Sequence, residues 1–170
     1  MIKFFNKACQ VLAVVAGLAT LVFFFLNFVK YNMADGNVVN ASASQIGFGT
    51  ELYNGLNVAR SSKILFNIIM TAFALVTAIF TFFSKSRVLK YVSTAASAVV
   101  AIFMLVVALG EPTAFIDARP FAVKSIEYTS FVLFTSIAMF LSTAAGVGHF
   151  LLSDYIDVLQ SKGTKKPLLK

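Results

Sequence analysis

The chain has 170 residues, of which 59% are hydrophobic and only 12% are charged. Soluble domains carry about 45–50% apolar and about 25% charged residues, so this composition excludes an ordinary soluble domain. The net charge is +7, but the basic residues lie in short segments between apolar runs, which argues against a nucleic-acid partner. The single cysteine, Cys9, excludes an intramolecular disulfide and a cysteine-based metal cluster within one chain.

Four uncharged apolar segments are long enough to cross a hydrocarbon core, which takes roughly 20 helical residues. Their apolar runs are continuous rather than alternating, which favours helices over barrel strands. We therefore predict an all-α integral membrane four-helix bundle over residues 1–161, with a small β-hairpin in the first outer loop. The predicted helices are about 8–29, 64–83, 91–110 and 129–152.

The first segment, 8–29, follows Lys3 and Lys7, as the apolar region of a secretory signal peptide would. It is longer than such a region, and no small-x-small cleavage site lies close to its end. We therefore predict an uncleaved first span. Cys9 is expected to be a plain buried or lipid-facing thiol, with palmitoylation as the alternative.

The first outer loop, 30–63, is the longer of the two outer loops. Within it, Val38–Gly49 combines β-branched residues with glycines and shows little helical periodicity. This pattern predicts a short hairpin or two small strands. Asn40 begins an Asn-Ala-Ser glycosylation pattern, which matters only in a eukaryotic secretory pathway.

The remaining connections follow from their lengths and composition. The short loop 84–90 requires the second and third helices to form an antiparallel hairpin. Pro112 and Pro120 punctuate the second outer loop, 111–128. Residues 162–170 form a basic tail, which we expect to be disordered and to contact anionic headgroups.

The basic residues are shared unequally between the two sides of this arrangement. Nine of them lie in the two termini and the loop 84–90, together with two acidic residues. The two outer loops carry five basic and five acidic residues. The positive-inside rule therefore predicts that both termini are cytoplasmic, and we expect the protein in the cell membrane.

Small residues recur at four-residue spacing on three of the predicted helices, a pattern that lets helix backbones approach closely. We interpret them as packing seams inside the bundle, although an interface between copies would use the same residues. These residues are Ala13, Gly17, Ser93, Ser97, Ala101, Ala138, Ser142 and Gly146.

His149, Ser153 and Asp157 also recur every four residues, so they would share one face if the fourth helix continued. A histidine and a carboxylate on one face could bind a metal ion or relay a proton, but two protein ligands make a weak site. We prefer a solvated helix end whose acidic residues meet nearby lysines. We predict no metal site, no cofactor and no catalytic residue.

Two further features limit the functional class. None of the four segments carries a charge in mid-membrane, which argues against a proton- or cation-coupled carrier. Asn27 and Asn67 lie near the outer ends of the first two helices, where we expect them to bond to each other or to loop backbone. A pore-lining pair is the alternative.

The four-span layout, with a long first outer loop, resembles that of claudins, tetraspanins and MARVEL-domain proteins. The resemblance is one of topology, because the first outer loop has neither the tryptophan and cysteine pair of claudins nor the loop cysteines of tetraspanins. A shared layout implies no shared function.

These observations predict a non-enzymatic structural or interaction component, or an accessory subunit. Its expected partners are membrane lipids and other membrane proteins or copies of itself, but not nucleic acid. One alternative is an enzyme that acts on lipid through His149 and Asp157. The main alternative is an oligomeric channel or carrier for a small neutral solute, lined by Ser93, Thr94, Ser97, Ser136 and Thr143.

Overall fold

The computed structural model describes residues 1–52, 56–58, 60–84, 86–111 and 123–163. Within these residues the chain is mostly helical and carries several short strands. The helices are α1 (Ile2–Phe23), α2 (Ala43–Phe48), α3 (Ser62–Phe80), α4 (Arg87–Leu109) and α5 (Ser130–Gly163). The strands are β1 (Asn27–Met33), β2 (Val38–Ser42), β3 (Thr50–Leu52), β4 (Leu56–Val58) and β5 (Val123–Tyr128).

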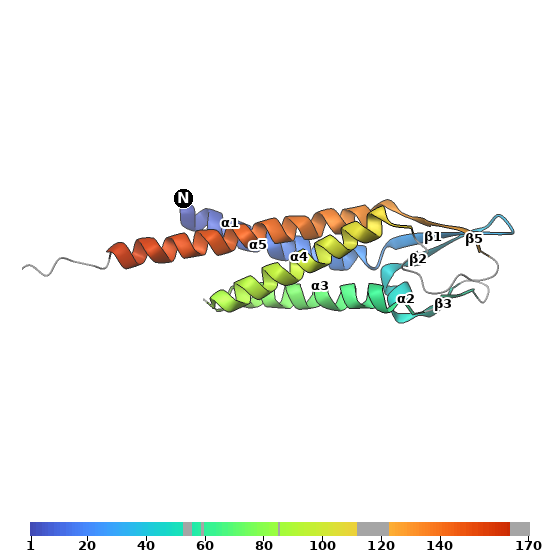
Figure 1. Ribbon diagram of the computed structural model, residues 1–170, viewed down its shortest axis with the longest axis horizontal. Helices are drawn as coiled ribbons and strands as arrows, with labels where there is room; N and C mark the ends of the chain where they lie inside the picture. The colour runs from blue at the N-terminus through green and yellow to red at the C-terminus, as the bar shows by residue number, and fades with distance from the viewer. Residues whose placement is uncertain (53–55, 59, 85, 112–122, 164–170) are drawn as a thin grey trace, which may run out of the picture.

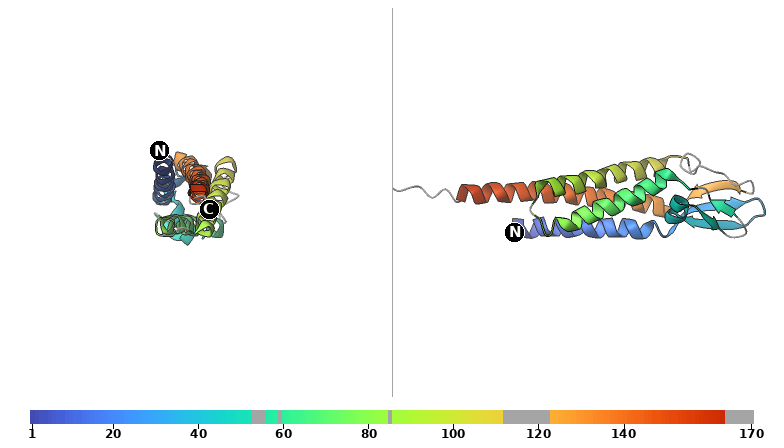
Figure 2. Two further views of the ribbon diagram at one scale, coloured as in Figure 1. Left: turned by 90° about the vertical axis from the view of Figure 1, so that its left-hand side faces the viewer. Right: turned by 90° about the horizontal axis from the view of Figure 1, so that it is seen from below.

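The four long helices lie side by side, and the strands gather at one end of them (Figure 1). α1 packs against α5 and α3, and α4 packs against the same two helices. A view along the helices shows the four of them around a common interior (Figure 2). We call the end with the strands the sheet end. The opposite end, where α1 begins and α5 finishes, is the terminal end.

All four long helices are long and apolar enough to cross a membrane, judged by length and composition. Each of them also exposes large apolar side chains, for example Leu12, Ile69, Ile102 and Leu133. Water solvates such surfaces poorly, and contiguous apolar surface of this extent typically marks contact with lipid or with another protein.

The first helix ends earlier than the sequence predicts. The predicted span was 8–29, whereas α1 covers Ile2–Phe23 and β1 follows at Asn27. β1 pairs with β2 on one side and with β5 on the other, so its backbone groups are bonded across the sheet. An apolar run shows which residues avoid water but cannot distinguish a helix from a strand whose partners lie far along the chain.

The last helix continues beyond its predicted end at residue 152. α5 reaches Gly163, and its extension carries Asp154 and Asp157. The carboxylates of these residues lie 3.2 and 3.8 Å from Arg87 nitrogens. The predicted spans 64–83 and 91–110 correspond to α3 and α4, with ends that differ by four residues or fewer.

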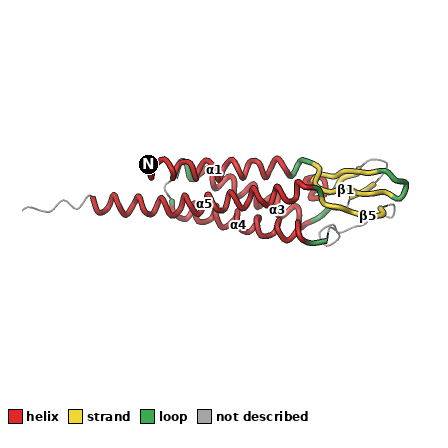
Figure 3. Tube along the Cα trace, turned by 90° about the horizontal axis from the view of Figure 1, so that it is seen from above, coloured by secondary structure: helices red, strands yellow, loops and turns green. Residues whose placement is uncertain are grey.

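Three strands form an antiparallel sheet in the order β2-β1-β5 (Figure 3). The β1–β2 turn contains Gly36, whose φ of 86° suits glycine. The Asp35 carboxylate accepts hydrogen bonds from the backbone and side-chain nitrogens of Asn37, at 3.0 and 2.8 Å. These bonds lower the pKa of Asp35 below its usual value.

The region predicted as the first outer loop therefore takes part in a hairpin, β1–β2, but the hairpin does not lie within Val38–Gly49 as predicted. Only β2 comes from that stretch, and α2 follows it. The Ser42 hydroxyl accepts from the Gln45 backbone nitrogen at 3.2 Å, and the Gln45 side chain accepts from the Ser42 nitrogen at 2.8 Å. This reciprocal cap starts α2. Strands β3 and β4 form a second hairpin.

An all-α class is thus only partly right, because the helices carry a small sheet. β5 lies in the predicted loop 111–128 and pairs with β1, for example Ile126 with Tyr31. The proline-containing part of that loop, 112–122, and the tail residues 164–170 lie outside the described residues.

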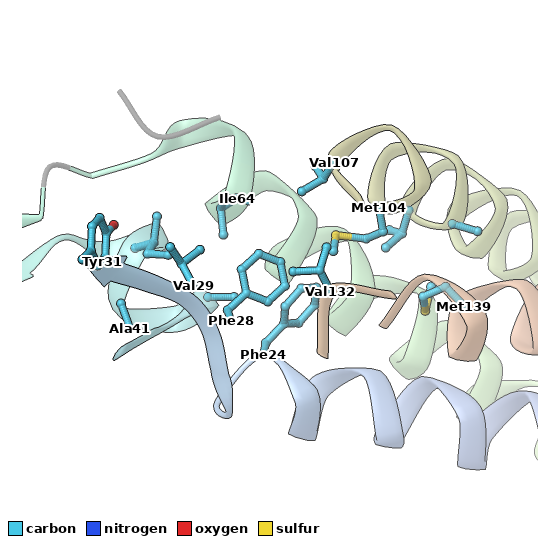
Figure 4. Close-up of a cluster of buried hydrophobic side chains, with 14 of the residues drawn as sticks. Phe24, Phe28, Val29, Tyr31, Ala41, Ile64, Met104, Val107, Val132 and Met139 are labelled. Carbon is cyan, nitrogen blue, oxygen red and sulfur yellow. The ribbon is translucent and has the colours of Figure 1, made fainter. Parts of the chain in front are cut away.

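A buried core joins the sheet to the helices (Figure 4). Phe24 and Phe28 are fully buried and connect α1 to β1. Their ring centroids lie 6.4 Å apart, and that of Phe28 lies 6.2 Å from Tyr128. The side chains packed around them come from sheet and helices alike, including Val29, Tyr31, Ala41, Ile64, Met104, Val107, Val132 and Met139.

We expect two sheet tyrosines to ionise well above the usual range. Burial raises the pKa of Tyr31 from 10.0 to about 12, and burial together with the nearby Tyr31 raises the pKa of Tyr128. A raised value means that the folded state favours the neutral phenol. Burial penalises the phenolate, so the folded state is unaffected below pH 10.0 and loses stability relative to the unfolded chain as the pH rises toward about 12.

An ultraviolet absorbance titration of the folded protein checks this expectation. It should show an early phase of tyrosine ionisation and a late phase that coincides with loss of the near-ultraviolet circular dichroism. Tyr31→Phe should reduce the amplitude of the late phase. Ionisation of every tyrosine near the ordinary pKa, in protein that is still folded, would contradict it.

Candidate functional site at the terminal end of the helices

Serine side chains link the four long helices across their interior. The Ser93 hydroxyl of α4 donates to the Ala74 carbonyl of α3 at 3.2 Å. The Ser142 hydroxyl of α5 donates to the Ala13 carbonyl of α1 at 3.0 Å. The two pairs are adjacent, because the Ser97 hydroxyl, which donates to the Ser93 carbonyl of its own helix at 3.0 Å, lies 3.4 Å from the Ser142 hydroxyl. Such bonds in an apolar interior hold neighbouring helices together.

Two glycines permit close contact between helices. A Cβ at Gly146 would lie 2.6 Å from the Thr94 Oγ1, and a Cβ at Gly17 would lie 3.3 Å from the Leu75 Cδ1. Each glycine therefore faces a neighbouring helix. The other small residues named from the sequence are buried: Ala13, Ser93, Ser97, Ala101, Ala138 and Ser142.

The residues considered as the lining of a pore between copies are turned inward or bonded within their own helix. Ser136 is 1% exposed. Thr94 donates to the Lys90 carbonyl and Thr143 to the Met139 carbonyl, both at 2.9 Å. Ser93 and Ser97 are also buried, at 7% and 3% exposure.

His149 is the most buried ionisable residue of the terminal end. It is 7% exposed, and its Nδ1 lies 2.6 Å from the Asn6 Oδ1 of α1. Its Nε2 has no hydrogen-bond partner among the described residues. A buried ring nitrogen without a partner is costly, so this atom faces a place where a further polar group is favourable.

Ser153 and Asp157 share the face of His149 but contact different residues. The Ser153 hydroxyl accepts from the Lys90 Nζ at 2.6 Å, whereas Asp157 lies near Arg87. In the described ion pairs the cation is Arg87, and the side chains of the tail lysines lie outside the described residues, so the expected contacts with lysines stay a prediction. The three residues do not converge as one ligand set.

A small polar cavity lies between the helices beside His149. Its volume is about 10 Å³, which is about the space that one water molecule needs. The Gln10 side chain, which lines it, donates to the Thr81 hydroxyl at 2.9 Å. The other polar lining residues are Thr81, Lys90, Ser93, Thr94 and His149.

The residues of the terminal end can supply hydrogen bonds and positive charge, and few of them are carboxylates that could bind a metal ion. Within the described part of the chain, no group of three His, Cys, Asp or Glu side chains is placed to hold a metal ion. What the terminal end offers is a half-buried ammonium at Lys90, two exposed lysines on α1, and the amide and hydroxyl groups of Asn6 and Ser153.

Sequence reasoning did not identify Asn6, Gln10 or Lys90 as parts of a site. Gln10 could have been noticed in the sequence, because it is a polar residue in an otherwise apolar segment. Lys90 was counted only as a basic residue of a loop. Asn27 and Asn67, in contrast, do not pair: Asn27 is exposed on β1, and the Asn67 amide donates to the Lys63 carbonyl at 2.8 Å. Cys9 is half-buried and unpaired.

Comparison with known proteins adds no family. No protein-family model matches the chain, and no curated protein is similar to it at a significant level.

Proposed function

We propose that the chain is a four-span membrane protein that acts as a non-enzymatic structural or interaction component, or as an accessory subunit. Its long helices would form a transmembrane four-helix bundle, with both termini in the cytoplasm and the sheet outside. The observation that carries the proposal is the contrast between a filled interior and an apolar exterior.

The exterior supports placement in lipid. Each long helix exposes large apolar side chains over much of its length, and all four meet the length and composition of a membrane span. The unequal distribution of basic residues along the sequence supports the proposed orientation, since nine of them lie in the two termini and the loop 84–90.

The interior favours an interaction role over transport by a single copy. Met104, Met139 and Val100 are fully buried between the helices, and the cavity beside His149, nearer the terminal end, has a volume of only about 10 Å³. The Ser93 and Ser142 hydroxyls donate across helices, from α4 to α3 and from α5 to α1. The part left to meet a partner outside the membrane is the sheet end, where Val38 and Phe48 are exposed.

Membrane fractionation followed by co-purification tests the proposal. We expect the chain to sediment with membranes and to emerge from gentle detergent with a partner or as a defined oligomer. Val38→Ser and Phe48→Ser should reduce recovery of that partner by removing exposed apolar contacts. Asn40→Ser, a change from polar to polar on the same strand as Val38, is the matched control.

Three results would overturn parts of this proposal. Recovery in the supernatant of a detergent-free lysate would contradict membrane placement, and an N-terminal tag outside the cell would contradict the orientation. A strictly monomeric species without a partner would contradict the interaction role. Solute flux through proteoliposomes would instead favour the oligomeric channel or carrier.

A further inference from the structure

A vestibule opens at the terminal end between α1, α4 and α5. Its volume is about 300 Å³. Lys3, Asn6 and Lys7 line it from α1, Lys90 from α4, and Ser153 and Asp157 from α5. These residues come from three separate parts of the chain, so the vestibule exists only in the folded protein.

The vestibule has an excess of positive charge. Three of its lining residues are lysines and one is an aspartate. Asp157 lies 3.8 Å from the Arg87 Nη2, so a cation outside the vestibule already offsets its charge. No ion pair joins Lys3, Lys7 or Lys90 to a carboxylate in the described part of the chain.

Lys90 distinguishes the vestibule from a solvated basic surface. Unlike Lys3 and Lys7, it is half-buried, and its Nζ donates to the Ser153 hydroxyl at 2.6 Å. An ammonium has three donor hydrogens, and one hydroxyl occupies only one of them. A partly desolvated charge without a counter-charge is unfavourable, and an anion beside it would offset that cost.

The vestibule and the small cavity beside His149 share Lys90 as a lining residue. Gln10 and His149 also line this cavity. The His149 Nε2 is buried and has no partner among the described residues. At about 10 Å³ that cavity has room for no more than about one water molecule, so a larger ligand would be held in the vestibule beside Lys90.

We propose that this vestibule binds a phosphate group, with Lys90 as the central contact and Lys3 and Lys7 at the rim. A phosphate has several acceptor oxygens that can meet ammonium groups from different directions, and lysine binds it as a point charge. Asn6 and Ser153 supply further donors. The phosphate group belongs either to the headgroup of an anionic lipid or to a free soluble phosphate.

Binding to the purified full-length protein in detergent tests the assignment. Inorganic phosphate is titrated by calorimetry, and phosphatidic acid is added in native mass spectrometry with phosphatidylcholine as the zwitterionic comparison. We expect saturable binding of phosphate or of phosphatidic acid, and weak binding of phosphatidylcholine. Binding of phosphatidic acid alone identifies a lipid headgroup, whereas binding of inorganic phosphate that displaces the lipid identifies a free phosphate.

Lys90→Gln should weaken binding roughly tenfold or more, because it removes a charge-assisted contact. Lys30→Gln is the matched control, since it removes an exposed lysine at the sheet end and should leave the affinity unchanged. If Lys90→Gln does not fold, the double variant Lys3→Gln, Lys7→Gln at exposed positions should still weaken binding.

The assignment is overturned if neither phosphate nor phosphatidic acid binds, or if phosphatidylcholine binds as well as phosphatidic acid. It is also overturned if folded Lys90→Gln binds as tightly as Lys30→Gln, or if the double α1 variant keeps the full affinity. These outcomes are independent of partner recovery through Val38 and Phe48, so this proposal and the interaction role can fail separately.

Discussion

Phe28→Ala is expected to lower the free energy of unfolding by about 3–5 kcal/mol, as loss of a fully buried aromatic side chain does. Phe28 is 0% exposed and lies between the helices and the sheet. Its ring contacts Phe24 and Tyr128. The strands around it are held by backbone pairing, so they cannot collapse into the cavity without breaking the sheet. Denaturation in detergent micelles, followed by circular dichroism, measures the loss.

Phe25→Ala is the matched control for this change. It deletes the same atoms only three residues away, but Phe25 is 67% exposed. We expect its effect to stay within roughly 0.5 kcal/mol, as is usual for surface positions. Equal losses for the two variants would show that the Phe28 site is not a packed junction.

Gly146→Val is expected to lower the free energy of unfolding by about 1–3 kcal/mol through overpacking. A Cβ at Gly146 would lie 2.6 Å from the Thr94 Oγ1 and 3.3 Å from both carbons of that side chain. Thr94 is short and its hydroxyl is bonded to the Lys90 carbonyl, so the two helices must separate. Helix propensity slightly favours valine over glycine. A net loss of stability in Gly146→Val would therefore be caused by the steric clash with Thr94.

A double variant and a control at an exposed position test whether the loss of stability comes from the contact between Gly146 and Thr94. Thr94→Ala removes the closest atoms, so Gly146→Val combined with it should recover much of the lost stability. Ala144→Val adds similar volume two residues away at an exposed position and should change stability little. Unfolding in detergent with the same variants is the measurement. No loss from Gly146→Val would mean that α4 and α5 are not in close contact there.

The small residues of the candidate packing seams were visible in the sequence, because helical spacing depends only on local positions. The polar contacts of the terminal end were not. His149 meets Asn6 across 143 residues, Gln10 meets Thr81 across 71, and Lys90 meets Ser153 across 63. A single sequence does not show which residues so far apart will be in contact. Lys90 was therefore interpreted only as a basic residue of a loop.

The sequence by itself determined the four long apolar helices, since their length and lack of charge are local properties that no partner needs to supply. The tertiary structure alone decided where α1 ends and that β1 follows it. The apolar residues after Leu26 avoid water equally well in a helix or in a strand, and pairing with β2 and with the distant β5 selects the strand. The vestibule has the same origin, because its lysines come from α1 and α4 and become neighbours only when those helices pack with α5.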